Sequence, residues 1–270
     1  MGIFDGVLLV SDLDGTLFNK TSRLSEENAA ALHSFMNRGG RFTVATGRSL
    51  QGFETPRHIV PMNAPTILSN GALIYDYENR QALRTIPLSD GFLPLCQKAH
   101  VKFPNVDIEA HLPDSTWAIG QSEFSTLHRE IVQVGAIQAE TPADVPPGWL
   151  KALFIAAHDD LLVLRDWLLP HCQDRFDLMF SHPLLLEMQD MHVNKGDGAA
   201  WLADRLGISH ENVYCAGDYQ NDISMLSRFS SFSPLNAEPD VKASANQIGP
   251  DCNDHFIAWV VSRLEEKYQV

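Results

Sequence analysis

The N-terminal part of the chain alternates between short apolar runs and amphipathic stretches. Residues 7–10 are uniformly apolar, which is typical of a strand buried on both faces of a parallel sheet. Residues 25–38 carry apolar side chains at helical spacing, Ser25 is a suitable N-cap, and two glycines end the segment. Residues 42–45 then form a second apolar run. A strand, a helix and a strand at this spacing predict a βαβ unit.

The pattern changes in the middle third of the chain. Residues 66–68 predict a third strand, and the Asn70–Gly71 turn leads into a further extended run at 72–75. Between residues 82 and 186 the regular βα rhythm is lost. Within this stretch we expect a strand, a helix and two extended runs, at 152–157, 159–169, 177–180 and 184–188. We interpret residues 82–186 as a separate α/β insertion.

The βα rhythm resumes after the insertion. The expected elements are a helix, a strand, a short helix, a strand and a C-terminal helix, at 196–206, 212–216, 222–226, 230–232 and 255–268. The sequence therefore predicts a Rossmann-like α/β core, residues 1–81 and 187–270, with a parallel sheet and helices on both faces. An α/β cap domain, residues 82–186, is inserted into this core.

Composition narrows the class of protein. Among 270 residues, 20 are basic and 34 are acidic, so the net charge is −14, which disfavours a nucleic-acid binder. The four cysteines form no CxxC motif, which favours reduced, buried thiols over a metal or redox site. No signal peptide and no apolar stretch long enough for a membrane span is recognisable. We therefore expect a cytoplasmic protein with no membrane or nucleic-acid partner.

Two carboxylates follow the first predicted strand. Asp12 and Asp14 are two residues apart, so both point to the same side if the chain remains extended. Ligands of open α/β sheets bind outside the carboxyl ends of the strands. Such a pair can act as nucleophile and general acid, or it can bind a hard cation. Taken alone, however, two acidic residues in a turn are more often simply solvated.

Three further groups of residues favour a phosphate site. Thr46 and Gly47 end the second predicted strand and offer a hydroxyl and a backbone N–H. Lys195 opens a predicted helix, where the helix dipole already favours an anion. Asp218 and Asp222 end another strand and supply oxygen ligands suited to Mg²⁺. Each group alone has an ordinary structural explanation.

The ordered set of motifs resembles the haloacid dehalogenase (HAD) superfamily. DLDGT at residues 12–16, Thr46, Lys195 and GDxxND at 217–222 match its four motifs in order, spacing and strand-end position. Residues 69–72, 194–196 and 236–237 resemble more narrowly the Cof-type phosphatases, in which a large α/β cap of type C2 is inserted between the second and third motifs. The chain departs from the usual pattern at residues 231–234 and 249–252, outside the four motifs.

The resemblance implies a role for each motif residue. Asp12 would be the nucleophile, and Asp14 the general acid and base. Mg²⁺ would be held by Asp12, by Asp14 through its carbonyl and by Asp218, with Asp222 either a ligand through water or a residue that orients Lys195. The other residues expected to bind the phosphoryl group or the substrate are Thr46, Lys195, Leu13, Gly47, Arg48, Asn70 and Asn221.

The function implied is Mg²⁺-dependent hydrolysis of a small organic phosphate through an aspartyl-phosphate. A sugar phosphate is the first expectation, and pyridoxal phosphate and flavin mononucleotide are others. A phosphoryl-transfer mutase and a catalytically silent protein that binds phosphorylated metabolites remain alternatives. Trp117, His182 and His192 are weaker candidates for contacts to the leaving group, since each has a simpler structural explanation. We expect a monomer or a homodimer.

Overall fold

The computed structural model describes residues 2–172 and 174–269. The chain divides into two compact units. The first unit contains Met1–Gly47, Pro56–Leu83 and Asn194–Val270, and the second contains Arg48–Thr55 and Arg84–Val193. The second unit overlaps most of the insertion expected at 82–186, but it extends to Val193, beyond the expected boundary at 186, and it also takes in eight residues directly after Gly47.

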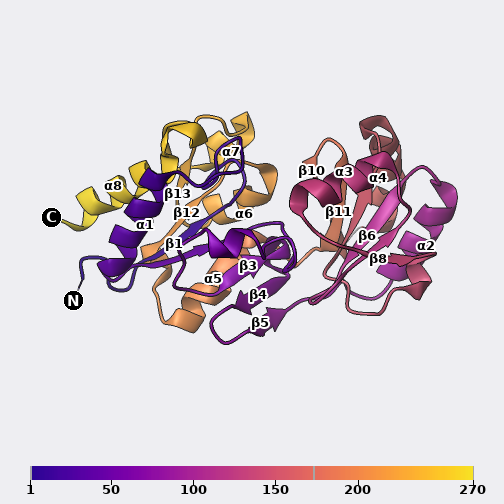
Figure 1. Cartoon of the computed structure of the whole chain (residues 1–270), viewed down its shortest axis with the longest axis horizontal. Coiled ribbons are helices and arrows are strands. Elements are labelled where there is room, and N and C mark those ends of the chain that lie inside the picture. The colour runs from indigo at the N-terminus through magenta and orange to yellow at the C-terminus, as the bar shows by residue number, and fades with distance from the viewer. Residues whose placement is uncertain (1, 173, 270) are drawn as a thin grey trace. The chain divides into compact units, whose positions relative to one another are not determined.

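A five-stranded parallel sheet forms the centre of the first unit (Figure 1). In spatial order its strands are β14 (Gln247–Ile248), β13 (Ser230–Ser233), β12 (Val213–Ala216), β1 (Leu8–Ser11) and β2 (Arg41–Val44). Strand β1, which has a neighbour on each side, is fully buried, as the apolar run at 7–10 predicts. Its residue Ser11 lies opposite Ala216 and Val44, so β1, β2 and β12 end at the same edge of the sheet.

A short three-stranded sheet continues the first unit. Its strands are β3 (Thr66–Leu68), β4 (Leu73–Asp76) and β5 (Gln81–Thr85), and a parallel bridge between Ala45 and Ile67 joins it to the end of β2. Between β3 and β4 the chain makes a tight turn in which Ser69, Asn70 and Gly71 all have positive φ. Two consecutive non-glycine residues in this region are strained, and such strain is often found at functional sites.

Helices cover both faces of the parallel sheet. α1 (Glu26–Asn37) and α8 (Phe256–Tyr268) lie side by side, and α8 packs Trp259 against Phe232 of the sheet (Figure 1). The other face of the sheet is covered by α5 (Lys195–Leu206), α6 (Ile223–Leu226) and α7 (Pro239–Ser244). These helices share a hydrophobic core with Leu8 and Val10 of β1. The prediction of an α/β core with helices on both faces is confirmed.

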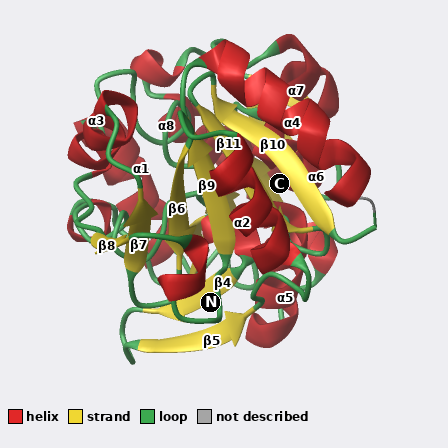
Figure 2. Cartoon of the chain, turned by 90° about the vertical axis from the view of Figure 1, so that its right-hand side faces the viewer, coloured by secondary structure: helices red, strands yellow, loops and turns green. Residues whose placement is uncertain are grey.

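The second unit is a six-stranded sheet with helices. In spatial order its strands are β10 (Phe176–His182), β11 (Leu185–Asp190), β9 (Lys151–Ile155), β6 (Asp107–His111), β7 (Thr116–Ile119) and β8 (Ile137–Ala139). All neighbours are antiparallel except β7 and β8. α2 (Phe92–Lys102) and α4 (His158–Cys172) cover one face and enclose the apolar core of this unit (Figure 2).

The opposite face of the six-stranded sheet carries buried charged side chains as well as apolar ones. Glu109 of β6 pairs with Arg129 at 3.1 Å, and Lys151 of β9 pairs with Glu187 of β11 at 3.0 Å. α3 (Glu123–Val132) joins this face through polar groups, because Ser125 donates a hydrogen bond to Asp107. Buried charges are costly unless they are paired, and these side chains are.

The cysteines and the helices agree with the expectations from composition. All four cysteines are free and buried, as the composition predicts. In the described part of the chain, no helix combines the length and the apolar character that crossing a bilayer would require.

Candidate metal and phosphate site

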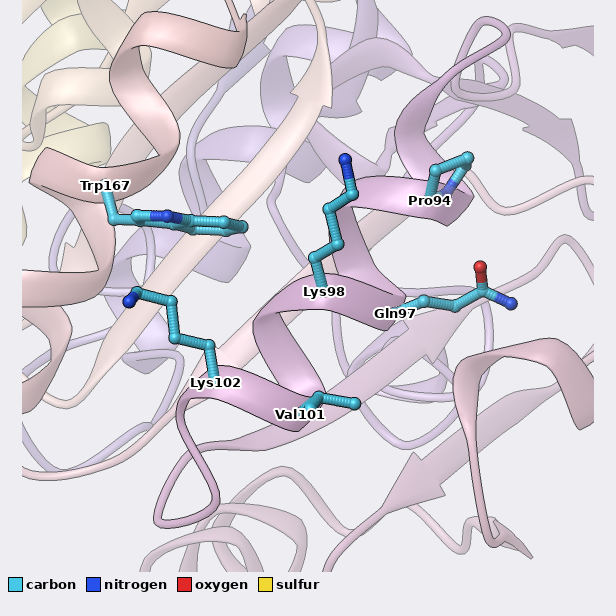
Figure 3. Close-up of a pocket in the computed structure, with 6 residues that line it drawn as sticks. All are labelled: Pro94, Gln97, Lys98, Val101, Lys102 and Trp167. Atoms are coloured by element: carbon cyan, nitrogen blue, oxygen red, sulfur yellow. The ribbon is translucent and has the colours of Figure 1, made fainter.

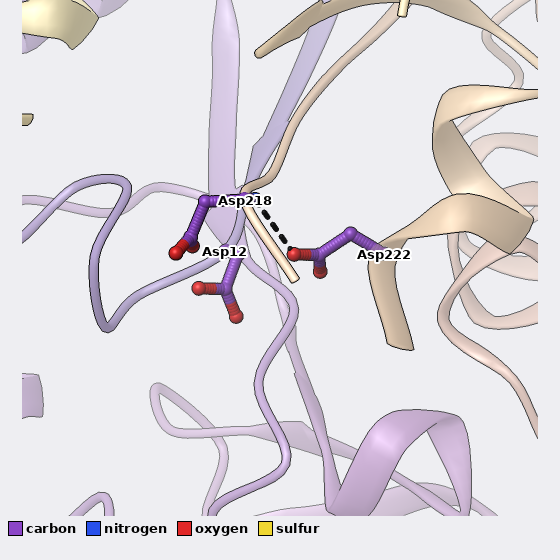
Figure 4. Close-up of side chains that lie close together, drawn as sticks. All are labelled: Asp12, Asp218 and Asp222. Atoms are coloured by element: carbon purple, nitrogen blue, oxygen red, sulfur yellow. Dashed lines mark hydrogen bonds between the residues drawn. The ribbon is translucent and has the colours of Figure 1, made fainter. Parts of the chain in front are cut away.

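Three carboxylates of the first unit converge at the carboxyl edge of its sheet. Asp12 directly follows β1, and Asp218 and Asp222 follow β12, so the parallel register brings them together. One oxygen from each of the three lies within 4.8 Å of the others. Figure 4 shows the Asp222 carboxylate directed toward Asp218, with the dashed line marking its hydrogen bond from the Asp218 backbone N–H. The two acidic motifs therefore meet in space as the sequence predicts.

A buried ammonium group completes this cluster. Lys195 is the first residue of α5, and its Nζ donates hydrogen bonds to Asp12 at 2.5 Å and to Asp222 at 2.6 Å. Asn194 caps the helix by accepting a hydrogen bond from the backbone N–H of Asp197, which fixes the direction in which α5 starts. Burial disfavours the charged ammonium, but the two carboxylates outweigh burial and raise the pKa of Lys195 above its ordinary value.

Crowding perturbs the carboxylates themselves. Burial raises the pKa of Asp12 well above its ordinary value, and the neighbouring charges of Asp222 and Asp218 add to this against the opposing effect of Lys195. Burial, followed by repulsion from Asp222, raises the pKa of Asp218 to about 7. A divalent cation would offset this repulsion, and three carboxylates are the hard oxygen donors that Mg²⁺ prefers. The residues present therefore fit a magnesium ion.

The two oxygens of Asp222 have different neighbours. Oδ1 accepts the hydrogen bond from Lys195, and Oδ2 accepts hydrogen bonds from the backbone N–H groups of Asp218 and Tyr219, at 2.9 and 3.0 Å. With donors on both oxygens, this carboxylate shapes the loop that carries Asp218 and holds Lys195 in place. This geometry favours the orienting role over direct metal ligation.

Several of the expected phosphate-binding residues lie around one junction of the first unit. Thr46 is buried at the end of β2, its N–H donates to Ile67, and its carbonyl accepts from the N–H of Asn70. Asn221 donates a side-chain hydrogen bond to Asn70 at 3.0 Å. A Cβ on Gly47 would lie 3.1 Å from Oδ1 of the same asparagine, so a side chain there would crowd it.

The strained turn at 69–71 packs tightly against the start of α5. A Cβ on Gly71, where φ is +105°, would come within 2.5 Å of the Asn194 carbonyl oxygen. Leu13 is fully buried between the two aspartates of the first motif, whereas Asp14 is exposed. The structure thus brings together, within the first unit, all of the predicted site residues except Arg48.

The other candidates belong to the second unit. Arg48 lies there with its neighbours, and its guanidinium donates to the Gly52 carbonyl. Trp117 packs on the apolar core of the unit, which is its simpler structural explanation. His182 ends β10, where its Nδ1 accepts from the Leu184 N–H. His192 follows β11, and its N–H donates to Asp190.

Two residues with a direct part in the geometry were not predicted. The hydroxyl of Thr16 donates a 2.6 Å hydrogen bond to Oδ1 of Asp218. Asn236 donates a 2.9 Å hydrogen bond to the carbonyl of Gly15. Both residues stand inside segments that carried the family resemblance, but nothing in residue type or spacing indicated which partner each would find.

The chain is similar in sequence to known hydrolases. The model of the haloacid dehalogenase-like hydrolases matches residues 9–261. The chain belongs to this family. Among its relatives, an HMP-PP phosphatase of Klebsiella pneumoniae is 29% identical over 257 residues, with 93% of each chain covered. The 5-amino-6-(5-phospho-D-ribitylamino)uracil phosphatase YcsE of Bacillus subtilis is 26% identical over 245 residues, covering 89% of this chain and 88% of its own.

Solved structures share the fold at lower identity. A haloacid dehalogenase-like hydrolase from Bacteroides thetaiotaomicron aligns with a TM-score of 0.86 at 20% identity, covering 96% of this HAD-family chain and 99% of its own. A HAD subclass IIB sugar phosphatase aligns with a TM-score of 0.82 at 18% identity, covering 96% and 98%. The chain is therefore a hydrolase of the Cof type, with the parallel-sheet core and the cap of that family.

A shallow hollow of about 520 Å³ lies on the second unit, between α2 and α4 (Figure 3). Lys98 and Lys102 project from α2 beside the ring of Trp167 from α4. Apolar surface dominates its lining, and the described residues that line it include no carboxylate, histidine or cysteine. Nothing in this hollow resembles the chemistry of the acidic cluster.

Proposed function

We propose that this HAD-family hydrolase cleaves phosphomonoesters of small organic molecules with the help of Mg²⁺, and that a sugar phosphate is the favoured substrate. The observation that supports this proposal is the convergence of Asp12, Asp218, Asp222 and Lys195 at one edge of the sheet. A dianionic phosphate can approach three carboxylates only if cations offset their charge. The buried ammonium supplies one positive charge, and the oxygen donors fit a second.

Asp12 is the nucleophile in this proposal. One of its carboxylate oxygens attacks phosphorus, the bond from phosphorus to the leaving alkoxide breaks, and an aspartyl-phosphate forms. Lys195 already holds Oδ1 of Asp12 at 2.5 Å, which favours the ionised form that the attack requires. Because a carboxylate is a modest nucleophile, most of the rate must come from positioning and charge neutralisation.

Asp14 carries the proton in both half-reactions. It donates a proton to the departing alkoxide and then takes one from the water that hydrolyses the aspartyl-phosphate. Its side chain is exposed, so water can reach it. Mg²⁺, held by Asp12, the Asp14 carbonyl and Asp218, would supply charge neutralisation for the phosphoryl oxygens.

The phosphoryl oxygens are bound by Thr46, Lys195 and the backbone N–H groups of Leu13 and Gly47. Preorganised donors of this kind stabilise the charge that builds up in the transition state. Asn70 and Asn221, which are hydrogen bonded to each other, are proposed to contact the substrate next to this cradle. Arg48 and the rest of the second unit are proposed to select the leaving group.

Relatives of this chain are named for differing substrates. One is called an HMP-PP phosphatase, another acts on a phosphoribitylamino-uracil, and a structural neighbour is called a sugar phosphatase. What these names share is a small phosphorylated metabolite. This favours a small organic phosphate as the substrate class and a sugar phosphate as the first compound to test.

A phosphate-release screen tests the proposal. Purified protein is assayed on a panel of sugar phosphates, pyridoxal phosphate and flavin mononucleotide, with Mg²⁺ and with excess chelator. We expect release that needs Mg²⁺ and that falls by at least about three orders of magnitude in Asp12→Asn. Release that continues in chelator contradicts the metal assignment, and near-normal turnover by the variant contradicts the nucleophile. Isomerised product with little free phosphate would instead identify a mutase.

A further inference from the structure

We infer that Asn236 is a positioning residue for the metal site, acting through Gly15 and Thr16 on Asp218. The inference rests on the metal site of the proposed function. The Asn236 amide joins two loops, because Nδ2 donates to the Gly15 carbonyl at 2.9 Å and Oδ1 accepts from the Cys252 N–H at 2.8 Å. Both polar atoms of this half-buried side chain are thus used, and neither touches a carboxylate of the cluster.

The connection from Asn236 to Asp218 is short and tight. Gly15 has φ of +82°, and a Cβ on it would come within 2.5 Å of Asp218 Oδ2, so its backbone lies directly against that carboxylate. The next residue, Thr16, donates its hydroxyl to Asp218 Oδ1 at 2.6 Å. Fixing the carbonyl of Gly15 therefore fixes the peptide group that leads into Thr16, and with it the orientation of the Asp218 carboxylate.

The turn that carries Asn236 is itself anchored on two sides. The N–H of Leu235 donates to the Pro250 carbonyl at 3.2 Å, and the N–H of Glu238 donates to the Asp218 carbonyl at 3.2 Å. One turn thus holds the first acidic loop through a side chain and the second through the backbone. Two segments that depart from the family pattern lie beside this turn. Residues 231–234 directly precede it, and residues 249–252 are hydrogen bonded to it.

Positioning matters here because the carboxylates repel one another. One oxygen of Asp218 lies within 4.8 Å of oxygens of Asp12 and Asp222, so like charges favour rotation of this carboxylate away from the cluster when no cation is bound. The hydroxyl of Thr16 opposes such a rotation. Loosening Gly15 should therefore weaken cation binding while leaving the nucleophile and the phosphate-binding groups in place, and it should act more strongly on metal affinity than on turnover at saturating metal.

Asn236→Asp is the sharpest variant for this test. It keeps the size of the side chain and an acceptor for the Cys252 N–H, but it places a carboxylate oxygen against the Gly15 carbonyl where an N–H donor stood. Asn246→Asp is the matched control. It makes the same chemical and charge change in the same unit at an exposed residue, whose Oδ1 accepts from the Ser231 N–H and keeps doing so as a carboxylate.

Mn²⁺ binding measured by electron paramagnetic resonance on metal-free protein gives a readout that is independent of activity. We expect the Kd of Asn236→Asp to rise about tenfold and that of Asn246→Asp to remain within twofold of the wild type. In the phosphatase assay, the Mg²⁺ concentration for half-maximal activity should rise in parallel, with kcat recovered at saturating Mg²⁺. Unfolding curves verify that both variants fold.

The outcomes separate this inference from the proposed function. A folded Asn236→Asp variant with unchanged Kd for Mn²⁺, or one whose kcat stays low at saturating Mg²⁺ with an unchanged Kd, overturns the positioning role. Wild-type protein that binds no Mn²⁺ overturns it as well. If no phosphate is released from any substrate but Mn²⁺ binding still depends on Asn236, the proposed function fails and the inference stands. Asn236→Ala gives the same test if the aspartate variant does not fold.

Discussion

The buried Lys195 offers a test of how the acidic cluster is held together. In Lys195→Met the ammonium is lost, while a side chain of similar length still fills the space. Asp12 and Asp222 then remain buried, with oxygens within 4.8 Å and without the counter-ion that now bridges them at 2.5 and 2.6 Å. Removing one partner of a buried ion pair costs about 3–5 kcal/mol, because the remaining charge is left uncompensated.

We therefore expect the free energy of unfolding of metal-free Lys195→Met at pH 7 to fall by about 3–5 kcal/mol. The loss should shrink on acidification. Without Lys195, the pKa of Asp12 in the folded state lies even further above its value in the unfolded chain, so the ionised folded state is penalised at neutral pH and relieved when a proton binds. Added Mg²⁺ should restore part of the stability, since it supplies positive charge to the same carboxylates.

Urea denaturation followed by circular dichroism at pH 5 and pH 7 measures these effects. Arg205→Ala is the matched control, because it removes an exposed cation from the same helix, and it should change stability by less than about 0.5 kcal/mol. A decrease for Lys195→Met below about 1 kcal/mol at pH 7, or a loss that grows toward pH 5, would refute the picture of a charge-balanced buried cluster.

Two further predictions concern the strained turn and the charged face of the second unit. Gly71→Ala should destabilise the protein by at least about 2 kcal/mol in urea denaturation and reduce phosphatase activity, because its Cβ would meet the Asn194 carbonyl at 2.5 Å; wild-type stability would show that the turn can yield. Burial lowers the pKa of His128 from 6.5 to about 4, so only the unfolded chain takes up this proton between those values, and about 3 kcal/mol of stability should be lost as pH falls from 6.5 to 4. His128→Gln should flatten that part of the urea-derived stability profile, and an unchanged profile would assign the loss to other groups.

The core strands could be predicted from the sequence because burial on both faces leaves a continuous apolar run. The first strand was expected at 7–10 and lies at Leu8–Ser11. The shift of one residue arises because backbone pairing, not hydrophobicity, sets strand ends. Ser11 is polar, yet it lies opposite Ala216 and Val44 in the sheet. The predicted bounds of α1, α5 and α8 agree with the structure to within about two residues. Capping residues mark the ends of α1 and α5, and apolar spacing marks α8.

The charged face of the second unit could not be read in the same way. Along β6, Glu109 alternates with apolar residues, which normally indicates solvent on that side, whereas Lys151 begins the otherwise apolar strand β9. Both are buried, because their charges are compensated by side chains from other elements. Along α3 the usual pattern is reversed, since Leu127 and Ile131 are exposed while Ser125 is buried. Such pairing depends on tertiary contacts that a single sequence does not display.

The convergence of the acidic residues could be anticipated from the positions of the motifs at strand ends. Asp12, Lys195, Asp218 and Asp222 come from three distant segments of the sequence. The parallel register of β1 and β12 brings the aspartates to one edge of the sheet, and Lys195 reaches them from the start of α5. The hydrogen bonds that hold these side chains in place could not be predicted from the sequence. Whether Thr16 bonds to Asp218, or Asn236 to Gly15, depends on loop conformations that neither spacing nor periodicity determines.

The eight residues Arg48–Thr55 have a practical consequence for anyone who wishes to exchange specificity between relatives. They belong to the second unit, where Thr55 donates a hydrogen bond to Gln133, although they are separated in sequence from the rest of that unit by residues 56–83. A chimera that receives only residues 84–193 from a relative would keep its own residues 48–55. These residues pack against its original 84–193 segment and not against the new one. Grafts should carry both segments, joined at Gly47, Pro56, Leu83 and Asn194.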